Sequence, residues 1–328
     1  MNSIADQYRT IETGAGWAAL DARGRIRVDG RDAVPFLQAL LTNDVAKLAA
    51  GEGVYSAYLT PNGRMIADLE VLHRGDHLLV CVAPGVAPGL AARLDGLVFA
   101  EEVQIADESL QLYELGVVGP EAACALARAL GSDPETLVRL PESWQTDWGG
   151  GFVSKGGGAL VPVFRLFGAV RDRQAVIERL ESAGIRAVNP EVMETLRILA
   201  ARPAWGAELT EETIPLEAGL LDRAISTSKG CYVGQEIIIR MLHRGGGRVA
   251  RRLVMLAFAD AQDGAALVGA TLRSLSGADA GRVTSATVDP SSGQLIALAY
   301  LRSDHAQVGE QLTVADSGAK AVVTMVTT

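Results

Sequence analysis

The chain has 328 residues, 48% of them hydrophobic and 21% charged, a composition typical of a globular protein with about two or three domains. Its formal net charge of −9 repels phosphate backbones and argues against broad, non-specific binding of nucleic acid. The three cysteines have no paired spacing, and the four histidines are scattered, so we expect neither a disulfide framework nor a metal site. No apolar run reaches the roughly 20 residues of a membrane span, and the first residues lack the apolar core of a signal peptide. We therefore expect a cytoplasmic protein.

Residues 31–48 predict the first clear helix of the chain. Asp32 can serve as its N-cap, and Val34, Leu37, Leu40 and Leu41 share one helical face.

Residues 52–107 predict a unit of three strands, a helix and a closing strand. Turn signals separate the three strands at TPNG (60–63) and RGD (74–76). In the second strand, Asp68 and Glu70 share one face because side chains alternate along a strand.

The second half predicts further alternation of strands and helices, followed by an all-β end. The predicted elements are a strand in 110–119, a helix in 120–130 with Pro120 in its first turn, a glycine-rich loop in 141–160, a strand in 159–168, and helices in 171–184 and 189–200. From about residue 250, strand patterns alternate with Gly, Asp and Ser turns, which predicts a small β-barrel. The glycines at 245–247 form a predicted hinge into this barrel.

The segment KGCYVGQE (229–236) is the most informative short stretch. A thiol becomes a nucleophile or a ligand as the thiolate, and Lys229 lies two residues before Cys231. Gly230 and Gly234 allow the backbone to approach a ligand closely. A structural cysteine in a tight loop is the alternative interpretation.

The segment from Gly234 onward can open a helix with an i,i+4 pair of Glu236 and Arg240, although its three consecutive isoleucines favour a strand. If the helix forms, Cys231 lies near its positive end. The other two cysteines, Cys81 and Cys124, are predicted to pack in the core.

The longer segment IPLEAGLLDRAISTSKGCYVGQEIIIRM (214–241) resembles the signature of the YgfZ-type folate-binding proteins, whose mitochondrial counterparts support iron–sulfur cluster maturation. That family is a branch of the superfamily of the glycine-cleavage T-protein, a tetrahydrofolate-dependent aminomethyltransferase. Residues 36–72, 196–209 and 281–302 are also similar to this superfamily, in the same order along the chain.

The resemblance implies an α+β fold with three domains in a cloverleaf around a central, folate-sized cavity. The implied domains are a central folate-binding α/β domain (1–51 and 108–245), an inserted α/β domain (52–107) and a C-terminal β-barrel (246–328).

Two departures from the T-protein pattern bear on activity. The T-protein has an Asp-Asp pair, one member of which is thought to assist the one-carbon chemistry, where this chain has Ala67 and Asp68. Leu199 stands where the T-protein has a glutamate that holds the pterin, and losing one charged acceptor costs about 1.5–3 kcal/mol. The T-protein also lacks the cysteine of KGC. These departures favour the YgfZ branch.

The resemblance implies the following site residues. Cys231, Lys229 and Asp68 are the reactive candidates. The candidates for binding tetrahydrofolate are Asn43, Tyr55, Asp68, Gly230, Tyr232, Gly234, Gln235, Glu236 and Arg240. The alternatives are a helix-end turn for Asn43, core packing for Tyr55 and an exposed polar face for Asp68. A basic cluster that could hold a polyglutamate tail, an RNA phosphate or an acidic partner, or that is simply a solvated linker, comprises Arg240, His243, Arg244, Arg248, Arg251 and Arg252.

Three functions follow as hypotheses. The first is a monomeric, folate-binding accessory protein for iron–sulfur enzymes or assembly proteins, and for the tRNA modification that depends on them. The second is a folate-dependent aminomethyltransferase. The third, an RNA-modification factor that grips RNA directly, is disfavoured by the acidic total.

Overall fold

The computed structural model describes residues 3–157, 160–243, 248–259 and 264–327. The chain divides into two compact units, which are described separately. The first comprises Met1–Tyr58, Ala67–Met193 and Ser226–Tyr232, and the second comprises Leu59–Ile66, Glu194–Ile225 and Val233–Thr328. Within the described ranges, no helix is long and apolar enough to cross a membrane.

The first unit contains a six-stranded mixed sheet, in which β1 pairs in parallel with β11 and the other neighbours are antiparallel. Its strand order is β11 (Arg186–Ala187), β1 (Gly16–Ala19), β7 (Leu112–Val118), β10 (Val163–Ala169), β9 (Gly151–Gly156) and β8 (Gln145–Trp148).

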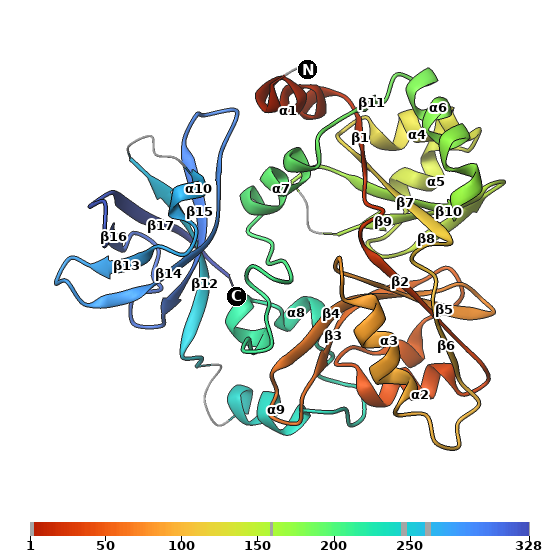
Figure 1. Cartoon of the computed structure of the whole chain (residues 1–328), viewed down its shortest axis with the longest axis horizontal. Helices are drawn as coiled ribbons and strands as arrows, with labels where there is room; N and C mark the ends of the chain where they lie inside the picture. The colour runs from red at the N-terminus through yellow and green to blue at the C-terminus, as the bar shows by residue number, and fades with distance from the viewer. Residues whose placement is uncertain (1–2, 158–159, 244–247, 260–263, 328) are drawn as a thin grey trace. The chain divides into compact units, whose positions relative to one another are not determined.

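Helices α4 (Ala122–Leu130), α5 (Pro134–Arg139) and α6 (Arg173–Ser182) pack on one face of this sheet (Figure 1). The sheet contributes alternate apolar residues of β7 and β10 to the shared core, because successive side chains of a strand point to opposite faces. Burying one such Leu or Phe side chain contributes about 1.5–3 kcal/mol. The unit also contains α1 (Ile4–Thr13), the 3-10 turn η2 (Val170–Asp172) and the first part of α7 (Pro190–Leu199).

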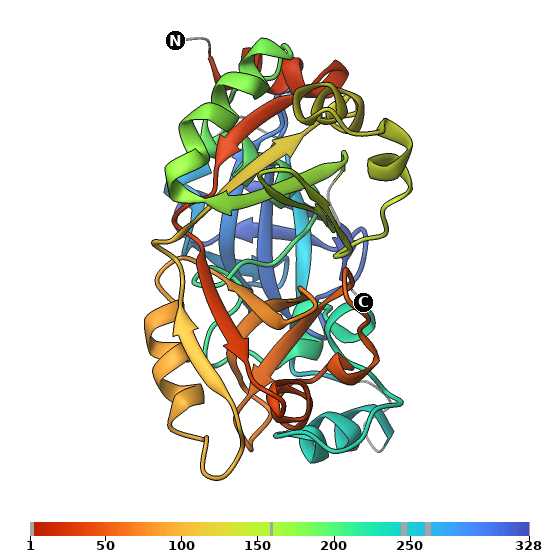
Figure 2. The same ribbon diagram turned by 90° about the vertical axis from the view of Figure 1, so that its right-hand side faces the viewer.

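A five-stranded sheet forms the other half of the first unit. Its order is β3 (Gly53–Leu59), β4 (Met65–His73), β5 (His77–Val82), β2 (Gly24–Asp29) and β6 (Gln104–Asp107). Helix α3 (Ala87–Asp95) contacts β2 and β6 (Figure 2). Helix α2 (Ala33–Leu40) and the 3-10 turn η1 (Val45–Lys47) lie between β2 and β3 in the chain.

The two sheets of the first unit share a layer of buried charge. Arg25 of β2 and Arg165 of β10 each lie 3.4 Å from a carboxylate oxygen of Glu114 on β7, and Arg165 also pairs with Glu70 of β4. Arg25 and Glu114 are 0% exposed, so each charge depends on its partners for stabilisation. Beside them lies an apolar cluster of Leu72, Leu79, Cys81, Phe152 and Phe167. The faces by which the two sheets of the first unit meet are therefore partly apolar and partly formed by buried ion pairs.

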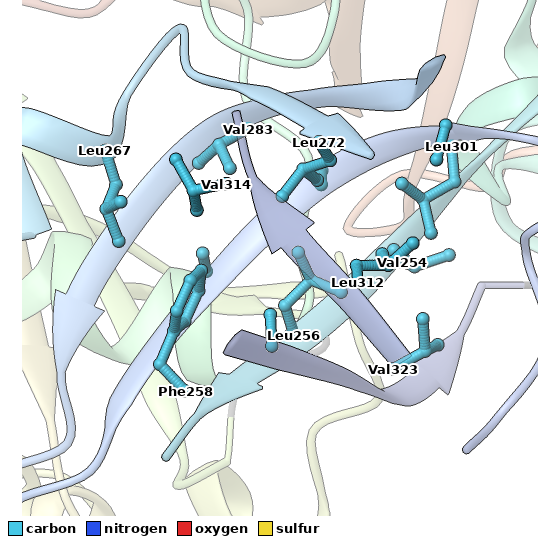
Figure 3. Close-up of a cluster of buried hydrophobic side chains, with 14 of the residues drawn as sticks. Val254, Leu256, Phe258, Leu267, Leu272, Val283, Leu301, Leu312, Val314 and Val323 are labelled. Atoms are coloured by element: carbon cyan, nitrogen blue, oxygen red, sulfur yellow. The ribbon is translucent and has the colours of Figure 1, made fainter. Parts of the chain in front are cut away.

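The second unit contains a closed barrel in the order β12-β15-β14-β13-β16-β17. Its strands are β12 (Arg251–Phe258), β13 (Thr271–Ser274), β14 (Asp279–Val288), β15 (Leu295–Arg302), β16 (Gln311–Val314) and β17 (Lys320–Val326). Alternate residues of β12 (Val254, Leu256 and Phe258) point inward with Leu272, Val283, Leu301, Leu312, Val314 and Val323 (Figure 3). The interior is thus filled by side chains, as a small barrel requires. Leu267 of α10 (Gly264–Leu267) joins this cluster.

The remaining elements of the second unit are the end of α7, η3 (Pro215–Ala218), α8 (Leu221–Ala224) and α9 (Gln235–His243). A buried carboxylate, Glu208, binds the segment before η3 to the barrel. It accepts hydrogen bonds from the Arg197 guanidinium at 2.9 Å, Thr284 Oγ1 at 2.7 Å, Ser285 Oγ at 2.6 Å and the Ala204 amide at 3.0 Å.

The α+β class, the C-terminal barrel, and the three strands with turns at 60–63 and 74–76 are confirmed. The three-domain boundaries and the central cavity stay predictions, and the hinge at 245–247 lies outside the described residues. Strand β2 was not predicted, and it hydrogen-bonds β5 and β6 of the five-stranded sheet.

Several local predictions were wrong. The predicted loop at 141–160 contains the hairpin of β8 and β9. Asp32 is the N-cap residue of α2, as predicted, but its carboxylate makes no capping bond and instead accepts from the Glu102 amide at 2.8 Å. Pro120 precedes the N-cap residue of α4. Cys124 is exposed, because α4 buries its neighbours on the opposite face.

Candidate functional site

Lys229 is a buried cation whose three N–H groups are all engaged. Its Nζ donates to the carbonyl oxygens of Gln38 at 2.7 Å, Leu41 at 2.6 Å and Asn43 at 3.0 Å. Burial lowers the pKa of Lys229 to about 8, and the nearby Asp44 carboxylate opposes this shift. At pH 7 the side chain is therefore an ammonium and can make all three bonds.

These carbonyls belong to the end of α2 and the turn that follows it. Carbonyl groups in the last turn of a helix have no partner within the helix, and a cation is favoured there. Lys229, which follows α2 by almost 190 residues in the chain, supplies both the hydrogen bonds and the charge.

Asn43 holds the turn between α2 and β3. Its Nδ2 donates to the Tyr55 carbonyl at 2.9 Å, and its Oδ1 accepts from the Asp44 amide at 2.9 Å. Its own amide donates to Ser56 Oγ at 2.9 Å. The predicted turn role of Asn43 is therefore present in the structure, and it sets the position of the start of β3.

Tyr55 and Asp68 meet on neighbouring strands β3 and β4. The Tyr55 hydroxyl donates to Asp68 Oδ2 at 3.0 Å, and both residues are half-buried. Asp68 is therefore not on an exposed polar face, and Glu70 on the same face is buried in the ion-pair layer. Tyr58, the other tyrosine of β3, is 3% exposed and packs in the core.

Arg23 was missed by the sequence reasoning. Its side chain is one-third exposed, with Nε 3.3 Å from Glu114 Oε1, and it interacts electrostatically with Asp68. A guanidinium therefore lies near the Tyr55–Asp68 pair. Arg23 directly precedes β2, and the charges in the stretch RGRIRVD (23–29) are unusual for a core strand and are the one signal that could have pointed to it.

The signature loop combines one exposed and one buried side chain. Cys231 is exposed. Tyr232 is 7% exposed, its ring centroid lies 5.4 Å from Lys229 Nζ, and burial raises its pKa to about 12. A cation over a tyrosine ring is a favourable contact, so Tyr232 helps to hold Lys229. At Gly230 an added Cβ would meet nothing within 4 Å.

The rest of the signature belongs to the second unit and forms the predicted helix, α9. Gly234 has φ +83°, and an added Cβ would lie 2.6 Å from the Thr60 carbonyl oxygen. The close approach at Gly234 is therefore to the turn between β3 and β4. Glu236, Arg240 and their neighbours line a surface groove of about 330 Å³ (Gln235, Glu236, Ile239, Arg240 and His243).

The structure thus brings together Asn43, Tyr55, Asp68 and Lys229, with Cys231 on the same loop as Lys229. In the predicted basic cluster, Arg251 pairs with Glu217 at 2.9 Å and Arg244 lies outside the described residues. Among the residues whose positions are described, no group of three or more His, Cys, Asp or Glu side chains is arranged to hold a metal ion.

The described elements together make a mixed α/β protein that ends in a closed β-barrel. Two family models match the chain, the GCVT N-terminal domain over residues 1–139 and the glycine cleavage T-protein C-terminal barrel domain over residues 251–328. The glycine cleavage system aminomethyltransferase T of Bartonella henselae superposes with a TM-score of 0.87 at 23% identity, covering 98% of this chain and 88% of that one. The predicted fold class is confirmed.

Among curated proteins, an aminomethyltransferase of Geobacillus kaustophilus is 32% identical over 322 residues, covering 95% of this chain and 86% of the relative. One of Bacillus subtilis is 27% identical over 321 residues, with the same coverage. The chain belongs to the aminomethyltransferase (glycine-cleavage T-protein) family.

Proposed function

We propose that the protein binds a reduced folate at Tyr55 and Asp68 and serves iron–sulfur enzymes as a YgfZ-type accessory protein through Cys231. The observation that carries this proposal is the link between the two halves of the candidate site. Lys229 of the KGC loop binds the Asn43 carbonyl, and Asn43 in turn binds the Tyr55 carbonyl. The loop that carries the exposed Cys231 thiol is therefore linked by hydrogen bonds, through Lys229 and Asn43, to the strand that carries Tyr55.

The residues present fit a reduced folate in kind. A pteridine offers N–H donors and an aromatic face, and the site offers a carboxylate acceptor (Asp68), a half-buried tyrosine ring (Tyr55) and a guanidinium (Arg23). Folate, when bound, supplies nitrogen atoms that carry one-carbon groups. In this chain Asp68 would accept from the ligand and Tyr55 would orient the Asp68 carboxylate.

Cys231 gives the protein a chemical group that the T-protein pattern lacks. An exposed thiol can be oxidised or can bind iron transiently as the thiolate. The hydrogens of Lys229 are directed to three carbonyl oxygens, so Lys229 holds the loop that carries Cys231 and does not donate to the thiol.

The cellular role is tested by comparing two cysteine substitutions that remove exposed thiols. Cys231→Ser should lower the activities of iron–sulfur enzymes in cells that depend on this protein, whereas Cys124→Ser should leave them unchanged. Normal activities of the iron–sulfur enzymes in the Cys231→Ser strain, with the variant protein at its normal level, would contradict an accessory role for this thiol.

Aminomethyl transfer is the second candidate, because relatives at 27% and 32% identity bear the name aminomethyltransferase and Asp68 is retained. Leu199, at the end of α7, cannot supply the acceptor that the T-protein pattern provides at that position. An assay for tetrahydrofolate-dependent aminomethyl transfer separates the two functions. Turnover by the wild type that is lost in Asp68→Asn would favour the transferase.

A further inference from the structure

Three hydrogen bonds, joined through the covalent structure of Asn43 and Tyr55, connect the signature loop to the carboxylate of the candidate folate site. Lys229 Nζ donates to the Asn43 carbonyl at 3.0 Å, and Asn43 Nδ2 donates to the Tyr55 carbonyl at 2.9 Å. The Tyr55 hydroxyl then donates to Asp68 Oδ2 at 3.0 Å. All four residues lie in the first compact unit.

The first member of this series is fixed from several sides. The ammonium has three donors, and each reaches a carbonyl between 2.6 and 3.0 Å away. Lys229 is 9% exposed, and the Tyr232 ring lies on one side of it. The Lys229 amide also donates to Ser226 Oγ at 3.2 Å, which holds the backbone of the loop. A side chain restrained in this way defines the positions of the atoms that it binds.

The next member, Asn43, is itself held at several points. Asn43 is held at its carbonyl by Lys229, at its amide by Ser56 Oγ, and at its side chain by the Tyr55 carbonyl and the Asp44 amide. Because Asn43 binds the main chain of Tyr55, a shift of the turn moves the tyrosine ring and the hydroxyl that orients Asp68.

We propose that Lys229 is a positioning residue for the folate site, which sets Asp68 through Asn43 and Tyr55. Lys229 thereby takes part in ligand recognition although it is far in sequence from Asn43, Tyr55 and Asp68. This proposal rests on the proposed binding of a reduced folate at Asp68.

The test uses the full chain with tetrahydrofolate under anaerobic conditions, and calorimetry to measure Kd. Lys229→Met keeps the length of the side chain and removes its donors. Tyr55→Phe removes only the last bond and preserves packing. Lys47→Met is the matched control, because it removes an ammonium that contacts Asp44 in the same turn at 2.8 Å while remaining 70% exposed.

We expect Lys229→Met and Tyr55→Phe each to raise Kd by about tenfold, the factor for one lost hydrogen bond to a charged group, and Lys47→Met to leave it unchanged. In the Asp68→Asn background, Lys229→Met should have little further effect, because its influence passes through Asp68. The proposal would be overturned if the fold-changes in Kd of Lys229→Met and Asp68→Asn multiply in the double variant. A wild-type Kd for Tyr55→Phe would also overturn it.

Hydrogen exchange of the amides of residues 42–46 provides a readout without ligand. Lys229→Met should accelerate this exchange at least tenfold while the amides of β5 stay protected, and Lys47→Met should not accelerate it. Unchanged exchange in Lys229→Met would overturn the positioning role. If the wild type binds no folate but this exchange still accelerates, the proposed function fails and the positioning of the turn by Lys229 stands.

Discussion

Replacement of Gly234 by alanine tests the packing of the signature helix against the turn between β3 and β4. Gly234 has φ +83°, and a left-handed conformation costs a residue with a Cβ about 1–2 kcal/mol. The new Cβ would also lie 2.6 Å from the Thr60 carbonyl oxygen and 3.1 Å from Leu59 Cβ. Relief of such a contact requires backbone movement and costs about 1–3 kcal/mol. The expected loss is therefore about 2–5 kcal/mol of the free energy of unfolding.

Gly230 offers a matched control in the same signature. An added Cβ at Gly230 meets no atom within 4 Å, so Gly230→Ala should change the free energy of unfolding by less than about 1 kcal/mol. Urea unfolding followed by circular dichroism measures both variants. If Gly234→Ala is as stable as Gly230→Ala, then Gly234 is not packed against the turn as described.

Three further predictions concern charge and thiol burial. Burial lowers the pKa of Lys229 to about 8, whereas a lysine in the unfolded chain has a pKa of about 10.4. Between about pH 8 and about pH 10.4 the unfolded chain therefore binds more protons than the native chain. The free energy of unfolding of the wild type, minus that of Lys229→Met, should therefore rise between pH 7 and 9.5, by about 3 kcal/mol at most; a fall would contradict this. Glu208→Ala should cost about 3–5 kcal/mol in urea unfolding, because the donors of Thr284, Ser285 and Ala204 lose this acceptor and Arg197 keeps only Glu194 as a carboxylate partner. Glu208→Gln should cost less, and equal losses would refute the role of the Glu208 carboxylate. An aromatic disulfide reagent should titrate Cys124 and Cys231 in the native protein and Cys81, whose pKa is raised by burial, only after unfolding; rapid reaction of all three would show an open core.

Short-range patterns were sufficient where each element is defined by its own residues. The strands around TPNG and RGD follow from alternation and turn residues, and the β-barrel predicted from about residue 250 is found there. The helix α9 forms despite Ile237, Ile238 and Ile239, because Ile238 is buried and Ile237 packs against Gly63 of the β3–β4 turn. Tertiary packing overrides the β-preference of these residues.

The candidate site was only partly predictable, because its contacts join residues far apart in sequence. Lys229 and Asp68 were selected through the signature and the family pattern, but Lys229 meets its carbonyl partners 186 to 191 residues away. The Arg165–Glu70 pair spans 95 residues. No local pattern identifies such partners. Cys124 was misplaced because its apolar character was given more weight than its helical position, which places it with Glu121 and Arg128 on the exposed face of α4.

The central claim is that Asp68 is the carboxylate that binds a reduced folate. A calorimetric titration of tetrahydrofolate into the wild type, Asp68→Asn and Asp76→Asn tests it most directly, since Asp76 is an exposed carboxylate in the turn before β5. We predict one ligand per chain for the wild type, at least about tenfold weaker binding by Asp68→Asn, and wild-type affinity for Asp76→Asn. No binding by the wild type, or equal binding by Asp68→Asn, would contradict the claim.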